Sequence, residues 1–372
     1  MSITRRRLVE GAAALLPAAT IRGSAANSAV TVGLIGAGGR GTYDATLLSK
    51  LPGARIVAVC DVFEEKIQKA KSSLGLNTAK TYTDYKDLLA SDVDAVLIAT
   101  PVYLHPEHFD AAVKAGKHIY IEKPAGADVE GCKRVMRAAD SADRKLNITF
   151  GFQQRYAPLS RKAQKLVSSG GIGKLRTAHS HWIKGINTTG ERVDEPKDEI
   201  DRIRKWKNFK ATFGDYIVET YCHGIDVLNW FLGGHPVKGL ASGTQTVILN
   251  NDMRDTVNVT FTYPGNVLAS LKGTQITPVW YRDVHEVFVG SNGVVETGRQ
   301  FSKHFRAKND VVEEKEPREI TIDALEEFVR RASGGSQPEN TGVSAAESTL
   351  TAILARMSMD LNREVSWEEM MR

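Results

Sequence analysis

The sequence predicts an α/β protein with two domains, and three observations support this fold class. A chain of 372 residues is longer than one ordinary hydrophobic core accommodates. Apolar strand segments alternate with helical segments up to about residue 152, which is typical of a parallel, doubly wound sheet. Longer strands separated by turn signals follow, and they predict a large open, mainly antiparallel sheet. We therefore expect a first domain at 28–152 and a second, α/β (α+β) domain at 153–372.

The first domain opens with the apolar run "AVTVGLIGAGGRG" at 29–41, which breaks into glycines where a helix should start. Later strands end at residues that disfavour a strand, as in "VDAVLIATP", which ends at Pro101. The intervening segments have apolar residues at helical spacing. Strands are expected within 29–36 and at 54–61, 93–101, 118–121 and 146–152, and helices at 42–51, 62–74, 106–117 and 126–142.

The second domain begins with a helix that a pair of glycines ends, and then changes to strands. The turn sequences "YPGN" and "GSNG" between strands indicate antiparallel hairpins. One helix at 216–234 interrupts the strands, and the last helices are expected to pack back on the first domain. The expected strands are 175–185, 237–249, 255–263, 266–276 and 285–297, and the remaining helices are 157–170, 322–333 and 344–360.

Composition excludes several classes of function. With 42% hydrophobic and 25% charged residues, the chain is typical of a globular protein. The net charge is +5, and residues 1–27 contribute +3 of it through four arginines and one glutamate, so the remainder is nearly balanced. We therefore expect no nucleic-acid partner. The three cysteines have no CxxC spacing, which predicts neither a zinc site nor a disulfide framework.

Residues 1–27 have the pattern of a targeting segment. "TRRRLVEGAAALLPAAT" has a twin-arginine pair followed by a mildly apolar stretch that is too short to span a membrane. We expect a twin-arginine signal peptide, cleaved near Ala25 or Ala26, with export by the Tat machinery to the periplasm or the outside. The mature chain is expected to have no integral membrane segment. The alternative interpretation is a disordered basic tail.

Glycines at the first strand–helix junction predict a dinucleotide site. Gly36, Gly38 and Gly41 form G-x-G-x-x-G after an apolar strand and before a helix, inside a βαβ unit. Such glycines allow a tight turn and let backbone N–H groups approach a pyrophosphate at the helix N-terminus. The loop residues expected to bind the cofactor are Gly36, Gly38, Gly39, Arg40 and Gly41.

Asp61 stands at the end of the second strand, about twenty residues beyond the last glycine. A carboxylate there would accept hydrogen bonds from ribose hydroxyls and repel a 2′-phosphate. The prediction is therefore NAD rather than NADP. Arg40 leaves NADP open, because its guanidinium could stack on adenine or pair with a 2′-phosphate.

Two further segments carry residues suited to chemistry. "HIYIEKP" ends a buried strand on Glu122 and Lys123, and Pro124 biases Lys123 towards extended backbone. "YIVETYCHGIDVLNW" places Glu219, His223 and Asp226 at i, i+4 and i+7, on one face of the expected helix. A carboxylate one turn before a histidine can orient the ring and raise its basicity.

Five segments occur in the following order: "GLIGAGGRG", "ATPVYLH", "GKHIYIEKPAG", "GFQQRYAP" and "YIVETYCHGIDVLNWFLGG". Through these segments, the chain from residue 29 onwards resembles the Gfo/Idh/MocA family of glucose-fructose oxidoreductase and inositol dehydrogenase. The resemblance implies a Rossmann NAD(P)-binding domain followed by an α/β domain with an open sheet. It also implies a carbohydrate substrate and a homo-oligomer, a dimer or tetramer, formed through that sheet.

The resemblance also implies roles for individual residues. Lys123 would be the catalytic-site lysine that contacts the reacting hydroxyl, in a Lys–Pro peptide that is often cis in the family. His223 would be the general base, and Glu219 fills a position where the family usually has aspartate, so this chain departs from the pattern by one methylene group. The residues implied to line the nicotinamide side are Thr100, Pro101, His105 and Glu122.

Other residues are weaker candidates. Arg155, Lys184, Trp206 and Asp226 are expected to contact substrate. The basic segment "RIRKWKNFKATFGD" at 202–215 reads as a solvated loop in preference to a clamp for an acidic substrate. His179 and His181 alternate on one strand, but no third ligand is evident, so we predict no metal site and favour a substrate-facing or sheet-surface position.

Hydride transfer from a carbinol carbon to nicotinamide needs a proton acceptor and stabilisation of the developing alkoxide. His223 can accept the proton, and Lys123 can stabilise the oxyanion. Partial burial beside a positively charged nicotinamide would lower the pKa of Lys123 and let it share the base role. The leading interpretation is an NAD(P)-dependent oxidoreductase acting on a sugar or polyol, with a tightly bound cofactor if the chain is exported. The alternatives are a redox-neutral NAD-dependent glycosidase or epimerase, and a non-catalytic dinucleotide-binding sensor.

Overall fold

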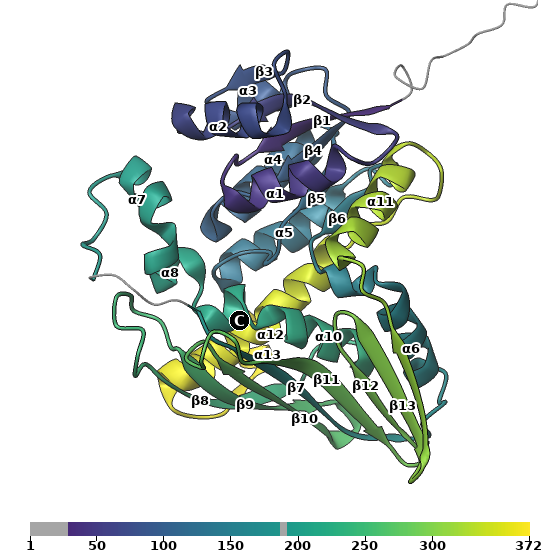
Figure 1. The fold of residues 1–372 in the computed structure, drawn as a ribbon. Coiled ribbons are helices and arrows are strands. Elements are labelled where there is room, and N and C mark those ends of the chain that lie inside the picture. Colours follow the sequence, from purple (N-terminus) through teal and green to yellow (C-terminus); the bar gives the residue numbers. More distant parts are fainter. Residues whose placement is uncertain (1–28, 187–191) are drawn as a thin grey trace, which may run out of the picture.

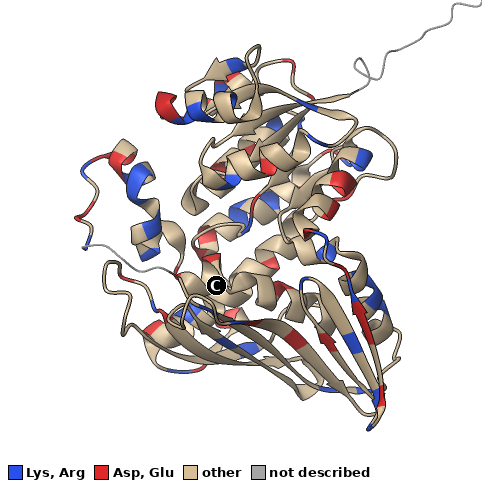
Figure 2. Ribbon diagram, in the orientation of Figure 1, with Lys and Arg blue, Asp and Glu red and all other residues tan. Residues whose placement is uncertain are grey.

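The computed structural model describes residues 29–186 and 192–372, which form two domains built around two sheets (Figure 1). The predicted signal peptide lies outside the described residues. The first sheet has six strands and the second has nine. The predicted fold class is confirmed: a Rossmann-type parallel sheet precedes a domain with a large, mainly antiparallel sheet. Basic and acidic residues are interspersed over both domains (Figure 2).

The first sheet is parallel throughout, in the order β3-β2-β1-β4-β5-β6. Its central strands are apolar on both faces, because helices cover both sides of a doubly wound sheet. The strands are β1 (Val30–Ile35), β2 (Ala54–Cys60), β3 (Lys80–Tyr82), β4 (Ala95–Ile98), β5 (His118–Ile121) and β6 (Ile148–Phe150). The helices between them are α1 (Gly39–Leu48), α2 (Glu64–Leu74), α3 (Tyr85–Leu89), α4 (His105–Lys114) and α5 (Val129–Ser141).

The second sheet has the order β14-β13-β12-β11-β7-β10-β9-β8-β15. Both predicted hairpins are present as antiparallel pairs, β9 with β10 and β11 with β12. The β7–β10 pair is parallel and sits in the middle of the sheet. The strands are β7 (Leu175–Lys184), β8 (Lys238–Thr244), β9 (Thr256–Tyr263), β10 (Val267–Thr274), β11 (Arg282–Gly290), β12 (Val294–Thr297), β13 (Phe301–Ala307), β14 (Asp310–Lys315) and β15 (Val365–Ser366).

Helices of the second domain lie between its sheet and the first domain (Figure 1). They are α6 (Pro158–Ser168), α10 (Cys222–Leu232) and α12 (Gly342–Leu361), all in contact with the sheet. Near the end of the chain, α11 (Ile320–Ala332) returns to the first domain, where the Phe328 ring packs edge-on against Tyr120 at 5.7 Å. The last segment, α13 (Trp367–Met371), follows β15. The two domains therefore share a hydrophobic core.

The helix predicted at 216–234 is broken in the structure. It consists of α9 (Tyr216–Glu219) and α10, separated by Thr220 and Tyr221. The backbone N–H groups of both intervening residues donate to the carbonyl of Tyr216, each at 2.9 Å, so the regular i→i−4 ladder is interrupted. The expectation that Glu219 and His223 stand one turn apart on a continuous helix was therefore wrong.

Within the described part of the chain, no helix has both the length and the apolar character needed to cross a membrane.

Gly41→Ala should lower the free energy of unfolding of the cofactor-free protein by about 2 kcal/mol or more. A Cβ at residue 41 would lie 2.0 Å from the carbonyl oxygen of Gly36, which is backbone and has little room to move. Gly39→Ala is the matched control, because nothing lies within 4 Å of its Cβ and alanine is the better helix former. Urea unfolding followed by circular dichroism measures both variants, and coincident midpoints would contradict this account.

Candidate active site

Two adjoining cavities lie at the carboxyl ends of the parallel strands, where ligands bind in open α/β sheets. The larger, of about 800 Å³, is bordered by the glycine loop and the ends of β1, β2 and β4. The smaller, of about 330 Å³, lies between the end of β5 and the second sheet. Arg40, Ala99, Thr100 and Trp206 border both cavities, so a ligand in one can reach a ligand in the other.

The glycine loop fits a bound dinucleotide. Gly36 has φ +93°, and a Cβ there would lie 2.7 Å from the carbonyl oxygen of Ala99, so only glycine suits the turn. Gly38 and Gly39 border the larger cavity with nothing within 4 Å of a Cβ, which leaves open space over the N-terminus of α1. This backbone would hold the pyrophosphate of NAD.

Asp61 follows β2 and borders the same cavity. Its carboxylate accepts hydrogen bonds from the backbone N–H groups of Ala37 at 2.9 Å and Phe63 at 3.0 Å. These bonds aim the side chain at the glycine loop. Burial raises the pKa of Asp61 above its ordinary value, and the two hydrogen bonds oppose that shift.

Arg40 is directed to carboxylates of the protein. Its guanidinium pairs with Glu122 at 2.9 Å and with Asp44 at 3.0 Å. Burial lowers the pKa of Arg40, but these two carboxylates outweigh burial and hold it above the ordinary value. The Arg40 guanidinium, which could have paired with the 2′-phosphate of NADP, is thus paired with Glu122 and Asp44 in this structure.

The basic segment at 202–215 is helical, so the expectation of a loop was wrong, although Arg204 and Lys207 are exposed to solvent as expected. It forms most of α7 (Glu199–Lys205), a 3-10 turn at Trp206–Asn208 and α8 (Lys210–Phe213). The Arg204 guanidinium lies 4.2 Å from the centre of the Phe63 ring, and Ile203, Arg204, Trp206 and Lys207 border the larger cavity. The segment therefore covers the cofactor side of the site.

Lys123 follows β5 and precedes a cis peptide bond to Pro124. Its ammonium donates to the carbonyl oxygen of Glu219 at 2.7 Å and to the Glu219 carboxylate at 2.9 Å. Burial lowers the pKa of Lys123, but the Glu219 carboxylate outweighs burial, so the net shift is upwards. Without a cofactor charge beside it, the lysine is thus an ammonium at neutral pH.

Glu219 is oriented by Lys123 and by the Thr220 hydroxyl, which donates to it at 2.8 Å. Burial raises the pKa of Glu219, and the Lys123 ammonium more than reverses that shift. The partner of Glu219 is thus Lys123, whereas the sequence spacing predicted that it would orient His223.

His223 borders the smaller cavity with Lys123 and Glu219. Its ring stacks on Trp182, with centroids 5.1 Å apart and planes 11° from parallel, and packs edge-on against Phe152 at 6.2 Å. Burial lowers the pKa of His223 well below 6.5, and the positive charges of Arg299 and Lys123 add to this effect. The imidazole is neutral at neutral pH and can accept a proton.

The residues expected on the nicotinamide side lie at the junction of the cavities. The ring nitrogens of His105 are 2.7 Å from the carbonyl oxygen of Pro124 and 2.9 Å from that of Thr100. His105 and Glu122 border the smaller cavity, Pro101 borders the larger, and Thr100 borders both. His105 thereby links the segments that follow β4 and β5.

The four candidate substrate contacts separate into two groups. Lys184 and Trp206 border the smaller cavity. Arg155 and Asp226 are not among the residues that border either cavity. Their side chains pair with each other at 2.8 Å, and the Asp226 carboxylate also accepts from Ser348 at 2.7 Å. The structure therefore gives this pair a place in the packing of α10 and corrects the expectation of substrate contact.

Sequence reasoning missed several residues of the smaller cavity. Trp182 lies near the end of β7, Arg282 begins β11, and Arg299 lies between β12 and β13. Gln153 follows β6 and accepts a long hydrogen bond of 3.5 Å from Arg299. No local motif marks these residues; alternation along the strands was the one available signal for Trp182.

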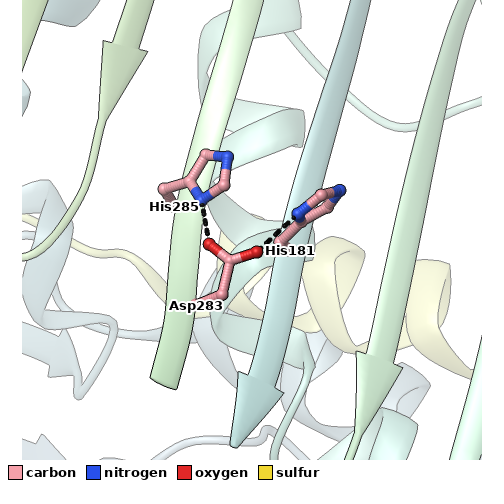
Figure 3. A group of neighbouring side chains, drawn as sticks. All are labelled: His181, Asp283 and His285. Carbon is pink, nitrogen blue, oxygen red and sulfur yellow. Dashed lines mark hydrogen bonds and ion pairs between the residues drawn. The ribbon is translucent and has the colours of Figure 1, made fainter. Parts of the chain in front are cut away.

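The histidines of β7 have neighbours that the sequence did not reveal. His181 Nδ1 lies 2.9 Å from Asp283, and His285 Nδ1 lies 2.6 Å from the other oxygen of the same carboxylate (Figure 3). One ligand atom from each of the three residues falls within 4.8 Å of the others. The prediction rested on the lack of a third metal-ligating group, and this premise was wrong, because the pairing of β7 with β11 brings Asp283 and His285 next to His181.

This fold and site define a two-domain, nicotinamide-dependent oxidoreductase: a dinucleotide cavity adjoins a smaller cavity with an ammonium and a neutral imidazole. Residues 30–150 match the family model described as oxidoreductase family, NAD-binding Rossmann fold, and residues 160–296 match that of the GFO/IDH/MocA C-terminal domain. The two models span more than half of the chain. The protein belongs to the Gfo/Idh/MocA family of NAD-dependent oxidoreductases.

Individual relatives agree with this assignment. The myo-inositol 2-dehydrogenase of Thermotoga maritima is 25% identical over 355 residues, 91% of this chain and 98% of that protein. Inositol 2-dehydrogenase 3 of Saccharopolyspora erythraea is 37% identical over 182 residues, 47% of this chain and 53% of that protein. The crystal structure of myo-inositol 2-dehydrogenase from Lactobacillus plantarum matches with a TM-score of 0.72 at 25% identity, covering 91% of this chain and 99% of that one. Levoglucosan dehydrogenase, in complex with NADH and levoglucosan, shares the fold with a TM-score of 0.77 at 18% identity, covering 91% of this chain and 99% of that one.

Glu219→Gln should lower the free energy of unfolding at pH 7 by about 2–4 kcal/mol, because it leaves a largely buried ammonium without its carboxylate. The contribution of Glu219 is present above pH 4.5, the ordinary pKa of the group, and is lost as the pH falls through the lower folded-state pKa. Urea titrations between pH 3 and pH 7 measure both effects.

The matched control is Glu313→Gln, which breaks the exposed Lys315–Glu313 pair and should change stability by well under about 1 kcal/mol. Equal effects of the two substitutions would contradict a special contribution from the Lys123–Glu219 pair.

Proposed function

We propose that this protein oxidises a secondary hydroxyl group of a sugar or polyol and transfers the hydride to NAD. One observation carries the proposal: Lys123 and a neutral His223 border one small cavity, and that cavity shares Thr100 with the cavity that fits the dinucleotide. The names of the relatives support the substrate class, since they include inositol and levoglucosan dehydrogenases.

The residues of the chain divide the work as follows. NAD, when bound, supplies the hydride acceptor. His223 accepts the proton of the substrate hydroxyl, because its imidazole is neutral at the working pH. Lys123 stabilises the oxygen as negative charge develops, and Glu219 keeps that lysine protonated and fixed in position. Trp182 holds the imidazole plane by stacking.

The direct test is NADH formation with purified protein, NAD and a panel of polyols and sugars that includes myo-inositol and levoglucosan. Product analysis must be independent of NADH absorbance, so that cleavage or epimerisation of a glycoside without net NADH is detected as well. That second result would replace the dehydrogenase by the redox-neutral alternative. Retention of biological effect by a Lys123→Ala variant without any turnover would favour a sensor.

For residues 1–27 we propose a twin-arginine signal peptide and export, supported by the "TRRRLVEG" motif. A cofactor that is exported with the folded protein should remain bound. Purified protein is therefore denatured, and mass spectrometry identifies any nucleotide that it releases, which tests for a tightly bound cofactor. Fractionation of cells that produce the native chain and its Arg5→Lys/Arg6→Lys/Arg7→Lys variant tests the route.

We also propose a homo-oligomer, a dimer or tetramer, that assembles through the second sheet. Leu240 and Leu268 support it, because they project from β8 and β10 with about half of their surface exposed, 51% and 50%. Light scattering of wild-type protein and of a Leu240→Glu/Leu268→Glu variant measures the assembly state; an unchanged mass would argue against this face.

His223→Asn should lower kcat by about 10²- to 10⁴-fold, the usual range for a general base. The acid limb of kcat/KM in the wild type should lie below pH 6.5, because the pKa of His223 is lowered and the base stays unprotonated down to that pKa. His235→Asn, remote from both cavities, is the matched control. A wild-type acid limb centred at or above pH 6.5 would contradict this assignment.

A further inference from the structure

The smaller cavity has an excess of positive charge on the side of the second sheet. Its border includes five basic residues and two acidic ones. Both carboxylates are in ion pairs, Glu122 with Arg40 and Glu219 with Lys123. Among the described residues, Lys184, Arg282 and Arg299 then have no carboxylate within 4.0 Å. Three cations thus face the substrate space without a counter-charge.

These three cations converge because of the sheet. Lys184 ends β7 and is the register partner of Arg282 at the start of β11. Arg299 lies over the face of Trp182, 5.6 Å from the ring centre, next to the stacked His223. The Nε of Arg299 is buried and has no hydrogen-bond partner. Its remaining contact is the 3.5 Å bond to Gln153.

The other carboxylates in the neighbourhood are already engaged. Glu296 pairs with Lys303 at 3.2 Å. Glu319 accepts hydrogen bonds from the backbone and hydroxyl of Thr321 at the start of α11. Burial raises the pKa of Glu286 to about 8, so this group carries no charge at neutral pH. None of these carboxylates forms an ion pair with the three cations. The charge of Glu319 reaches Arg299, but burial outweighs it and the net shift of the Arg299 pKa is downwards.

Partly buried cations without partners are costly in a folded protein. An arginine presents a fork of donors that matches the oxygens of a carboxylate or phosphate. We propose that the substrate is a monosaccharide that carries an oxyanion, a carboxylate or phosphate group, bound by Arg299 with Lys184 and Arg282 while the reacting hydroxyl lies at Lys123 and His223. The inference rests on the proposed function and adds the charge of the substrate to it.

The test compares sugars matched in their hydroxyl groups: D-glucose with D-glucuronate and glucose 6-phosphate, and D-galactose with D-galacturonate. The wild type should show the higher kcat/KM for an anionic member. Arg299→Gln and Arg282→Gln should each lower that preference by about 10- to 100-fold, the value of a charge-assisted hydrogen bond. The preference is a ratio of kcat/KM values measured on one variant, so an effect of Arg299 on His223, which acts on both sugars alike, cancels in it. The uronate and phosphate arms distinguish the two oxyanions.

Arg306→Gln is the control, because Arg306 is an exposed arginine of β13 paired with Asp310 and should leave the preference unchanged. Thermal unfolding gives a second readout. Arg299→Gln should leave the melting temperature of the ligand-free protein unchanged or raise it, whereas loss of a merely structural arginine would lower it.

Equal kcat/KM for neutral and anionic sugars in the wild type, or an equal loss on both in Arg299→Gln, would overturn the anion site and leave the dehydrogenase proposal intact. If no sugar is oxidised, the proposed function fails, and calorimetric binding of D-glucuronate in the presence of NAD still decides the inference. Binding that Arg299→Gln abolishes supports the anion site, and no binding overturns it.

A second, independent observation concerns the opposite face of the same sheet. His181, Asp283 and His285 lie on the opposite face of the sheet from Trp182, which borders the smaller cavity, because side chains alternate along β7 and β11. His181 and His285 are register partners, and Asp283 lies between their two Nδ1 atoms. In a single chain the three side chains are 32%, 27% and 20% exposed for His181, Asp283 and His285, so an ion can reach them before the proposed oligomer forms through this face.

Two imidazoles and one carboxylate are the ligands that divalent first-row metals such as Zn²⁺ prefer, and three protein ligands leave a coordination position for water. We infer that this cluster is a divalent metal site separate from the active site. With an ion bound, each imidazole would carry its proton on Nε2 and direct the lone pair of Nδ1 to the ion, and the Asp283 carboxylate would bind between them.

Calorimetric titration with ZnCl₂ of tag-free, EDTA-treated full-length protein should show one ion per chain. His181→Gln, Asp283→Asn and His285→Gln should each weaken binding by at least about tenfold, since even indirect partners of metal ligands cost 10- to 100-fold. Co²⁺ should give a visible absorption band that the same variants lose.

The controls are His304→Gln and Asp310→Asn, a histidine and an aspartate on β13 and β14 that lie outside the cluster. Wild-type binding in both controls supports the site. An absence of binding at micromolar Zn²⁺, or an equal loss in the controls, would overturn it. Circular dichroism establishes that every variant is folded.

Discussion

The ion pair between Lys123 and Glu219 is the interaction on which the rest of the site depends, because it joins the two domains at the point of reaction. Lys123 follows the parallel strand β5 of the first domain, and Glu219 ends the short helix α9 of the second. The ammonium contacts both the carboxylate and the carbonyl of Glu219, so its position is fixed twice. The pair also assigns charges: the lysine stays positive, and this positive charge helps to keep His223 neutral. This one ion pair thus gives the two groups different charge states: Lys123 is positive and can stabilise an oxyanion, and His223 is neutral and can accept a proton.

Much of the fold followed from the sequence, because the first domain is built from local signals. Apolar strands, helical periodicity and turn residues lie within a few positions of one another, and they identify the doubly wound sheet. The misses have physical causes. β3 is three residues long, and β13 and β14 are largely polar strands at one end of the second sheet, whose pairing no periodicity marks. The break at Thr220 was hidden because the apolar spacing of 216–234 continues across it.

Only those residues of the site that lie in local sequence motifs could be predicted. The glycine loop, Asp61, Lys123 and His223 sit in local patterns, and the structure brings them to two adjoining cavities. The partner of Glu219 could not be predicted, because helix spacing favoured His223 whereas the tertiary fold offers the stronger electrostatic interaction with an ammonium. Arg299 belongs to the turn between β12 and β13, and its place depends on the register of the whole sheet, for which a single sequence carries no signal.

That register links the two faces of the second sheet. Along β7 and β11, Lys184 and Arg282 pair on the face of the active site, and His181 and His285 pair on the opposite face. Because side chains alternate with a period of two, a slip of one residue would exchange the faces and move the histidines into the substrate cavity. The buried Trp182 prevents such a slip, since it packs against His223 inside the domain and has no comparable cover outside. The hydrophobic fit of one strand therefore fixes the arrangement of charge on both sides of the sheet.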